Sequence, residues 1–135
     1  MAKVLLATDA DWIYDEVEAA LDGDHEVIRV RRGADVGPTV LAHAPELAVL
    51  DLQIGNMGGV AVAIDLRLEE SGGRLPHVRI LLLLDRRDDV FIARRADVDL
   101  TLVKPVDAGV LRRAAAPLLA AAAAGDTDHD EPATN

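Results

Sequence analysis

The sequence contains no cysteine among its 135 residues and only one tryptophan, one tyrosine and one phenylalanine. The absence of cysteine excludes disulfide frameworks, thiolate metal sites and cysteine nucleophiles. Basic residues are also in deficit, because 14 lysines and arginines stand against 24 aspartates and glutamates, for a formal net charge of −10. Phosphates repel an acidic protein, so this balance argues against a nucleic-acid duplex or an anionic membrane surface as a direct partner.

Long apolar segments are missing as well. The first apolar run, Val4–Ala7, is too short for the core of a secretory signal and is soon followed by acids. The uncharged run Ala114–Gly125 falls well short of the length that spans a bilayer. The sequence therefore predicts a cytoplasmic protein.

Half of the residues are nevertheless hydrophobic, which excludes a chain that is disordered throughout. Short, nearly continuous apolar runs recur along the chain and are typical of strands buried on both faces of a parallel sheet. They are Val4–Ala7, Val27–Val30, Leu47–Leu50, Ile80–Leu84 and Leu100–Val103. The alternation of these runs with helical stretches predicts an α/β fold in which helices cover a five-stranded parallel sheet.

The helical stretches carry their own start and stop signals. Gly23 and Gly72 end the first and third, Gly37-Pro38 opens the second with proline at a first helical position, and Asp107 is an N-cap for the fifth. The fourth stretch, 88–96, has a weaker helical pattern. We expect one domain over residues 1–124 and a disordered acidic tail over 125–135. The tail carries four acids and no bases, which leaves a net charge of −6 on the domain.

Ligands of open parallel α/β sheets collect at the carboxyl ends of the strands. Asp9, Asp51 and Asp85 follow the first, third and fourth predicted strands, and Lys104, one of only two lysines, follows the fifth. Carboxylates that meet at one edge repel each other unless a cation lies between them, and Mg²⁺ suits that role because it takes one or two carboxylates and keeps several waters.

A purely structural interpretation competes with this one. An aspartate after a strand is often a helix N-cap, so Asp9 or Asp11 could cap the first helix. Asp85, Asp88 and Asp89 are expected to be solvated loop and capping residues rather than ligands.

The segment Val49–Gly59 resembles the phosphoacceptor segment of response-regulator receiver domains, with Asp51 after an apolar strand and with matching Met57 and Gly59. Gly55 stands where the family usually has proline. Lys104-Pro105 resembles the Lys-Pro junction after the fifth strand, which commonly carries a cis peptide bond, and Lys3–Asp9 resembles the first strand with its acidic pair. The resemblance covers residues from Lys3 to about Ala122, and implies a stand-alone, flavodoxin-like (βα)5 domain with strand order 2-1-3-4-5.

The resemblance also implies a chemistry. Asp51 would accept a phosphoryl group and form an aspartyl phosphate, so that the protein is a phosphoacceptor rather than a classical enzyme. Mg²⁺, weakly bound, would be held by Asp9, Asp51 and the backbone carbonyl of Gln53. Lys104 would pair with Asp51 and then with a phosphoryl oxygen. The donor would be a histidine kinase or a phosphotransfer protein, and the output would be binding to a downstream protein that the sequence does not identify.

Besides Gly55, four positions depart from the family pattern. Thr8 replaces the first acid of the pair, which should weaken Mg²⁺ binding, and Asp11 could substitute for it only through a water. A leucine, either Leu84 or Leu82, replaces the hydroxyl residue that normally hydrogen-bonds the phosphoryl group. Thr101 replaces the aromatic switch residue, and Asp97-Val98 replaces the usual Gly-Ala pair. We therefore expect acceptor chemistry to be better preserved than the usual conformational response.

Two other functions compete with phosphoacceptance. One is a degenerate receiver that binds proteins independently of phosphorylation. The other is a nucleotide- or flavin-binding domain, which the sequence disfavours because it has neither a Gly-x-Gly-x-x-Gly after the first strand nor a P-loop. The alanine-rich fifth helix could pack against the sheet or against a second copy in a homodimer, and the sequence leaves both open.

Overall fold

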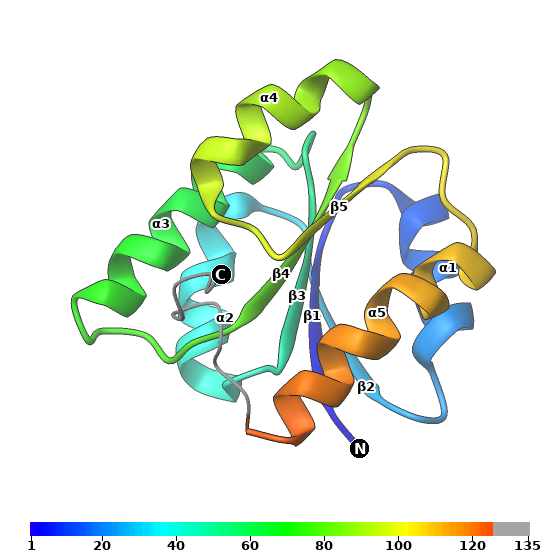
Figure 1. The fold of residues 1–135 in the computed structure, drawn as a ribbon, viewed down its shortest axis with the longest axis horizontal. Coiled ribbons are helices and arrows are strands. Elements are labelled where there is room, and N and C mark those ends of the chain that lie inside the picture. The colour runs from blue at the N-terminus through cyan, green and yellow to red at the C-terminus, as the bar shows by residue number, and fades with distance from the viewer. Residues whose placement is uncertain (126–135) are drawn as a thin grey trace, which may run out of the picture.

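A computed structural model describes residues 1–125. Apart from Gly125, the predicted tail lies outside these residues. Five parallel strands form one sheet in the order β2-β1-β3-β4-β5, as the sequence and its family resemblance predict (Figure 1). The strands are β1 (Lys3–Ala7), β2 (Glu26–Val30), β3 (Leu47–Asp51), β4 (Arg79–Leu84) and β5 (Leu100–Val103). The helices are α1 (Asp11–Leu21), α2 (Val36–His43), α3 (Gly59–Ser71), α4 (Val90–Ala93) and α5 (Ala108–Ala123). Short 3-10 helices occupy Gly33–Asp35, Arg87–Asp89 and Arg94–Ala96.

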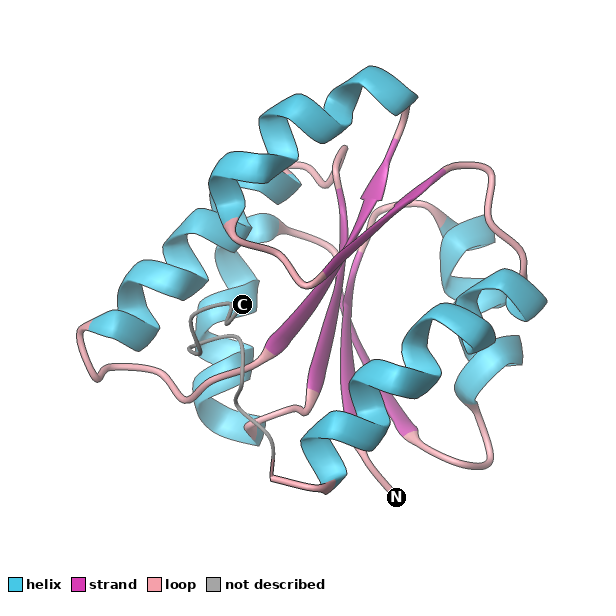
Figure 2. Ribbon diagram, viewed as in Figure 1, coloured by secondary structure: helices cyan, strands magenta, loops and turns pink. Residues whose placement is uncertain are grey.

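The helices cover both faces of the sheet (Figure 2). Helices α1 and α5 pack on one face, where alternate strand residues such as Leu6, Val49 and Leu83 join their buried apolar side chains. Helices α2, α3 and α4 pack on the other face, against the intervening residues such as Leu50 and Leu82. Because successive side chains of a strand point to opposite faces, nearly continuous apolar strands are what two covered faces require.

Two helices differ from their sequence prediction. Helix α2 begins at Val36, so Pro38 is its third rather than its first residue. The predicted helix over 88–96 is broken into a 3-10 turn, the single α-helical turn α4 and a second 3-10 turn, which ends at Asp97 with a φ of 52°. The predicted N-cap of α5 is confirmed, because the Asp107 carboxylate accepts a hydrogen bond from the Val110 N–H at 2.9 Å.

Among residues 1–125, no helix has both the length and the apolar character needed to cross a membrane.

Candidate phosphoacceptor site

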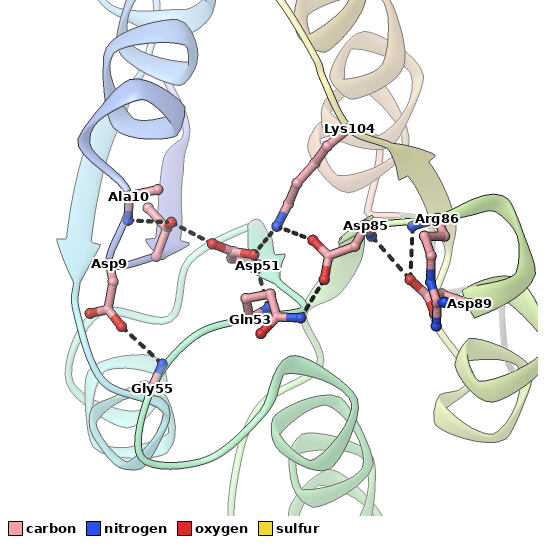
Figure 3. Close-up of polar contacts among 10 residues, drawn as sticks. Asp9, Ala10, Asp51, Gln53, Gly55, Asp85, Arg86, Asp89 and Lys104 are labelled. Atoms are coloured by element: carbon pink, nitrogen blue, oxygen red, sulfur yellow. Dashed lines mark hydrogen bonds and ion pairs between the residues drawn. The ribbon is translucent and has the colours of Figure 1, made fainter.

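Strand alternation brings four polar side chains to one row at the carboxyl edge of the sheet. Thr8, Asp51, Asp85 and Lys104 each lie two positions beyond a residue that is packed on the α1 and α5 side, namely Leu6, Val49, Leu83 and Leu102. The strand register sets them side by side, because Ala7 pairs with Leu50, Asp51 with Leu83 and Leu84 with Val103. The side chains of Asp51, Asp85 and Lys104 converge from three strand ends (Figure 3), and the Thr8 hydroxyl reaches Asp51 from a fourth.

Asp51 lies at the centre of this row, and its carboxylate is almost completely buried. Its Oδ2 accepts a hydrogen bond from the Thr8 hydroxyl at 2.7 Å. Its Oδ1 accepts from the Gln53 backbone N–H at 3.0 Å and forms an ion pair with Lys104 Nζ. A buried carboxylate requires such donors, because burial without them would disfavour its charged form.

Lys104 bridges two carboxylates, since its Nζ also contacts Asp85 Oδ1 at 2.8 Å. Burial alone lowers the pKa of Lys104, but the hydrogen bonds and charges of Asp51 and Asp85 outweigh it, so that the pKa lies above its ordinary value. Burial alone raises the pKa of Asp85, but hydrogen bonds from Lys104 and Gln53 Nε2 outweigh it and hold the pKa below its ordinary value. Both shifts favour the charged forms of Lys104 and Asp85, and the Lys104 ammonium contacts the carboxylates of Asp51 and Asp85 together.

Asp85 is the site residue that the sequence reasoning missed, because we expected it to be a solvated loop residue. The sequence did contain a signal for this position. Side chains two residues apart in a strand point to the same face, so Asp85 follows Leu81 and Leu83, which are buried on the α1 and α5 face. Asp89, by contrast, is a capping residue as expected, and its Oδ2 accepts hydrogen bonds from the backbone N–H groups of Asp85 and Arg86.

Asp9 is exposed and lies beside this row. Its Oδ2 accepts a hydrogen bond from the Gly55 N–H at 3.0 Å, in the loop that follows β3 (Figure 3). Neither Asp9 nor Asp11 caps α1: the residue before the helix is Ala10, whose N–H donates to the Thr8 hydroxyl at 3.0 Å. Asp11 forms ion pairs with Arg29 and Arg31 instead of pointing to Asp51.

The loop between β3 and α3 is shaped by small residues. A Cβ on Gly59 would lie 2.6 Å from the Asp51 carbonyl oxygen, and a Cβ on Gly55 would lie 2.9 Å from Asp9 Oδ2. Asn56 has a φ of 74°, a left-handed conformation that asparagine tolerates better than most residues, and its Oδ1 accepts from the Ala34 N–H. The loop can therefore close over the end of β3 and approach Asp51 and Asp9.

The chemistry of this donor set fits Mg²⁺. Asp9 and Asp51 supply carboxylate oxygens of the kind that Mg²⁺ prefers, and two protein carboxylates are as many as it typically takes. No group of three or more histidine or acidic side chains gathers as a metal cage within residues 1–125. Such a donor set would suit an ion that keeps most of its waters.

Two of the positions that depart from the family pattern lie on β4 and β5. The Lys104 N–H donates to the Leu84 carbonyl, and Leu84 pairs with Val103, so Leu84 rather than Leu82 occupies the end of β4. Its side chain is buried among the core residues under α3 and α4 and carries no hydroxyl to the site. Thr101 lies on β5 beside a cavity of about 400 Å³ that Val90, Ala93 and Leu100 also line. The Lys104-Pro105 peptide bond is cis.

Comparisons with solved structures place this fold. The chain is similar to the chemotaxis protein CheY4 of Vibrio cholerae, with 21% identity and a TM-score of 0.76 over 87% of this chain and 98% of that one. It is similar to the signal receiver domain of a histidine kinase from Syntrophus aciditrophicus, with 20% identity and a TM-score of 0.77 over 89% and 91% of the two chains. It is also similar to the Mn²⁺-bound response regulator Rcp1, with 20% identity and a TM-score of 0.71 over 86% and 93%.

No family model matches the sequence, and no curated protein matches it either. The protein thus has the fold of a response-regulator receiver domain, of the flavodoxin-like class with strand order 2-1-3-4-5. Because the sequence identity is only about 20%, the similarity to these structures establishes the fold alone.

Proposed function

We propose that this protein is a response-regulator receiver domain that accepts a phosphoryl group on Asp51 and signals by binding another protein. The observation that carries the proposal is the environment of Asp51, a buried carboxylate held by Lys104 and the Thr8 hydroxyl at the carboxyl edge of the sheet. The Lys104 ammonium is shared between Asp51 and Asp85 and is not committed to Asp51 alone. Lys104 can instead follow negative charge as it forms on a phosphoryl group.

The chain's own residues supply the nucleophile and the charge. An Asp51 oxygen forms the new bond to phosphorus while the bond from phosphorus to the donor's leaving group breaks, and the leaving group keeps that electron pair. Lys104 stabilises the phosphoryl oxygens, and Thr8 and the Gln53 N–H orient the carboxylate. Phosphoryl transfer depends mainly on such positioning and charge.

Mg²⁺, when bound by Asp9, Asp51 and the Gln53 carbonyl, would neutralise the charge that builds up between the carboxylates and the incoming phosphoryl group. The structure of Rcp1 contains Mn²⁺ in a related fold, which supports a divalent cation here. The donor would be a histidine kinase or a phosphotransfer protein, in keeping with the receiver fold found in a histidine kinase.

The test is incubation with acetyl phosphate and Mg²⁺, followed by intact-mass analysis. Wild type should gain one phosphoryl group, and Asp51→Ala should gain none. Asp65→Ala, which removes a carboxylate on α3 away from the strand ends, should be labelled like wild type. Unlabelled wild type, or equal labelling of Asp51→Ala, would refute the proposal.

A second function is favoured by a different observation. The residue that faces the site after β4 is Asp85 rather than a hydroxyl residue, and Thr101 is not aromatic, so the chain lacks the two groups by which receivers usually couple phosphorylation to a new conformation. The fold would then serve as a protein-binding module that is independent of phosphorylation. This alternative predicts that Asp51→Asn leaves partner capture unchanged, whereas a clear loss of capture would count against it.

A further inference from the structure

The structure ties the β4–α4 segment directly to the acceptor site through a charged residue. Asp85 is the first residue after β4, and its two oxygens are held separately, Oδ1 by Lys104 and Oδ2 by the Gln53 side chain. The Lys104 ammonium contacts Asp51 and Asp85 at the same time (Figure 3). The unmodified acceptor thus shares its only nearby lysine with the segment that leads into α4.

We propose that Asp85 is a charge gate that reads the state of Asp51, an inference that rests on the proposed phosphoacceptor function. In the unmodified protein, one cation balances two adjacent carboxylates and holds residue 85 inward. Phosphorylation replaces the single charge of Asp51 with a phosphoryl group of about two charges. Lys104 is drawn to that group, and Asp85 then faces it without a cation between them.

The direction of the movement follows from chemistry. A hydroxyl at the end of β4 would donate a hydrogen bond to the phosphoryl group and draw the segment inward. An ionised carboxylate has no proton to donate, and both Asp85 oxygens already accept from donors, the Lys104 ammonium and the Gln53 amide. Two anions at close range repel, most strongly where burial limits screening. Asp85 is therefore expected to move outward on phosphorylation and to take the segment with it.

The segment is built to move at small cost. After Asp85, the chain forms only short helical turns, of which α4 is a single turn of four residues. Phe91 and Ile92 on it are exposed, whereas Ala93, Ala96 and the partly buried Val90 anchor it to the core. Few buried contacts would be lost if the turns shifted, and an outward movement of Asp85 would carry Phe91 and Ile92 with the surface.

Hydrogen–deuterium exchange of the full chain tests the gate. Wild type, Asp85→Asn and Asp88→Asn are compared with and without acetyl phosphate and Mg²⁺, and intact mass is recorded on the same samples. Asp88→Asn is the matched control, because it removes the same charge from an exposed position of the same segment.

Phosphorylated wild type and Asp88→Asn should exchange about tenfold faster over residues 85–93 than their unmodified forms. This corresponds to about 1.4 kcal/mol in the free energy of opening. Asp85→Asn should be phosphorylated without that increase, because its amide is neutral and can donate to the phosphoryl group.

The outcomes separate this proposal from the function on which it rests. Wild type that gains no phosphate would overturn both. Wild type that gains phosphate without faster exchange over 85–93, or with the same increase in Asp85→Asn, would overturn the gate alone.

Discussion

Two parts of this molecule meet at Lys104 and are built differently. The acceptor edge, defined as Thr8, Asp51 and Lys104, is fixed by short contacts between groups that are nearly buried. The response segment, defined as residues 84–96, is a chain of short helical turns with exposed Phe91 and Ile92. This difference is what the proposed function would require, since a nucleophile must be held in position and a surface that responds to its modification must be able to shift.

The two parts also differ in how they depart from the receiver pattern. The acceptor edge keeps its central aspartate and its lysine, and replaces one acid by Thr8. In the response segment, the Leu84 side chain is buried on the opposite face of the sheet, and the residue that faces the site is Asp85, which contacts Lys104. We infer that the acceptor edge can keep its phosphoacceptor residues while the conformational response of the segment to phosphorylation differs from that of other receivers. Four predictions test the rigidity of the edge and its link to the segment.

The largest effect is expected for Lys104→Ala. This change leaves the buried Asp51 carboxylate without its cation, and breaking a buried ion pair from one side typically costs about 3–5 kcal/mol. Urea unfolding should show this loss in the free energy of unfolding, and acetyl phosphate should no longer label the protein. Lys3→Ala, at an exposed position and the only other lysine, should unfold like wild type.

Gly59→Ala should disturb the loop that closes over Asp51. The added Cβ would lie 2.6 Å from the Asp51 carbonyl oxygen and 2.9 Å from the Leu52 Cα, which are backbone atoms that cannot give way easily. Overpacking of this kind costs about 1–3 kcal/mol. Gly37→Ala on α2 meets nothing within 4 Å and should be neutral or stabilising. Equal unfolding free energies for the two variants would show that the loop is not tightly packed.

Thr8→Val should weaken the edge without changing its shape. The variant loses the hydrogen bond to Asp51 Oδ2 and the acceptor for the Ala10 N–H, both at a buried position. Leaving such partners unsatisfied costs about 1–3 kcal/mol. Thr39→Val on α2, where the hydroxyl donates to the exposed Asp35 carbonyl, is the control and should lose less in thermal unfolding.

The smallest effect concerns pH. Because the pKa of Asp85 is lowered in the folded protein, its stabilisation is present above the unfolded-state value of about 4 and is lost as pH falls through the folded value. The raised pKa of Lys104 acts at the other end, where stabilisation is lost as pH rises beyond about 10.4. The difference in unfolding free energy between wild type and Asp85→Asn should therefore be constant near neutrality and shrink in acid. If the difference does not change between pH 7 and pH 3, the ionised Asp85 carboxylate does not stabilise the folded protein.

Most of the fold could be predicted from the sequence, because the patterns that specify strands and helix ends are local. Apolar runs of four or five residues predicted all five strands, and Asp107 predicted the start of α5. The segment 88–96 was predicted less well, because its weak helical pattern indicated one helix and the structure has three short turns. The Asp residues after strands were the hardest to sort, since capping and ion pairing use the same residue type.

By itself, the sequence determined which residues end the strands, and therefore that Asp51 and Lys104 would stand at one edge of a parallel sheet. Only the tertiary structure decided the partners of each charge. Thr8, Asp85 and Lys104 come from three strands that are far apart along the chain, and the sheet register brings them onto Asp51 or its lysine. The physical reason is that strand formation depends on local hydrophobic patterning, whereas an ion pair depends on distances that exist only once the sheet is assembled.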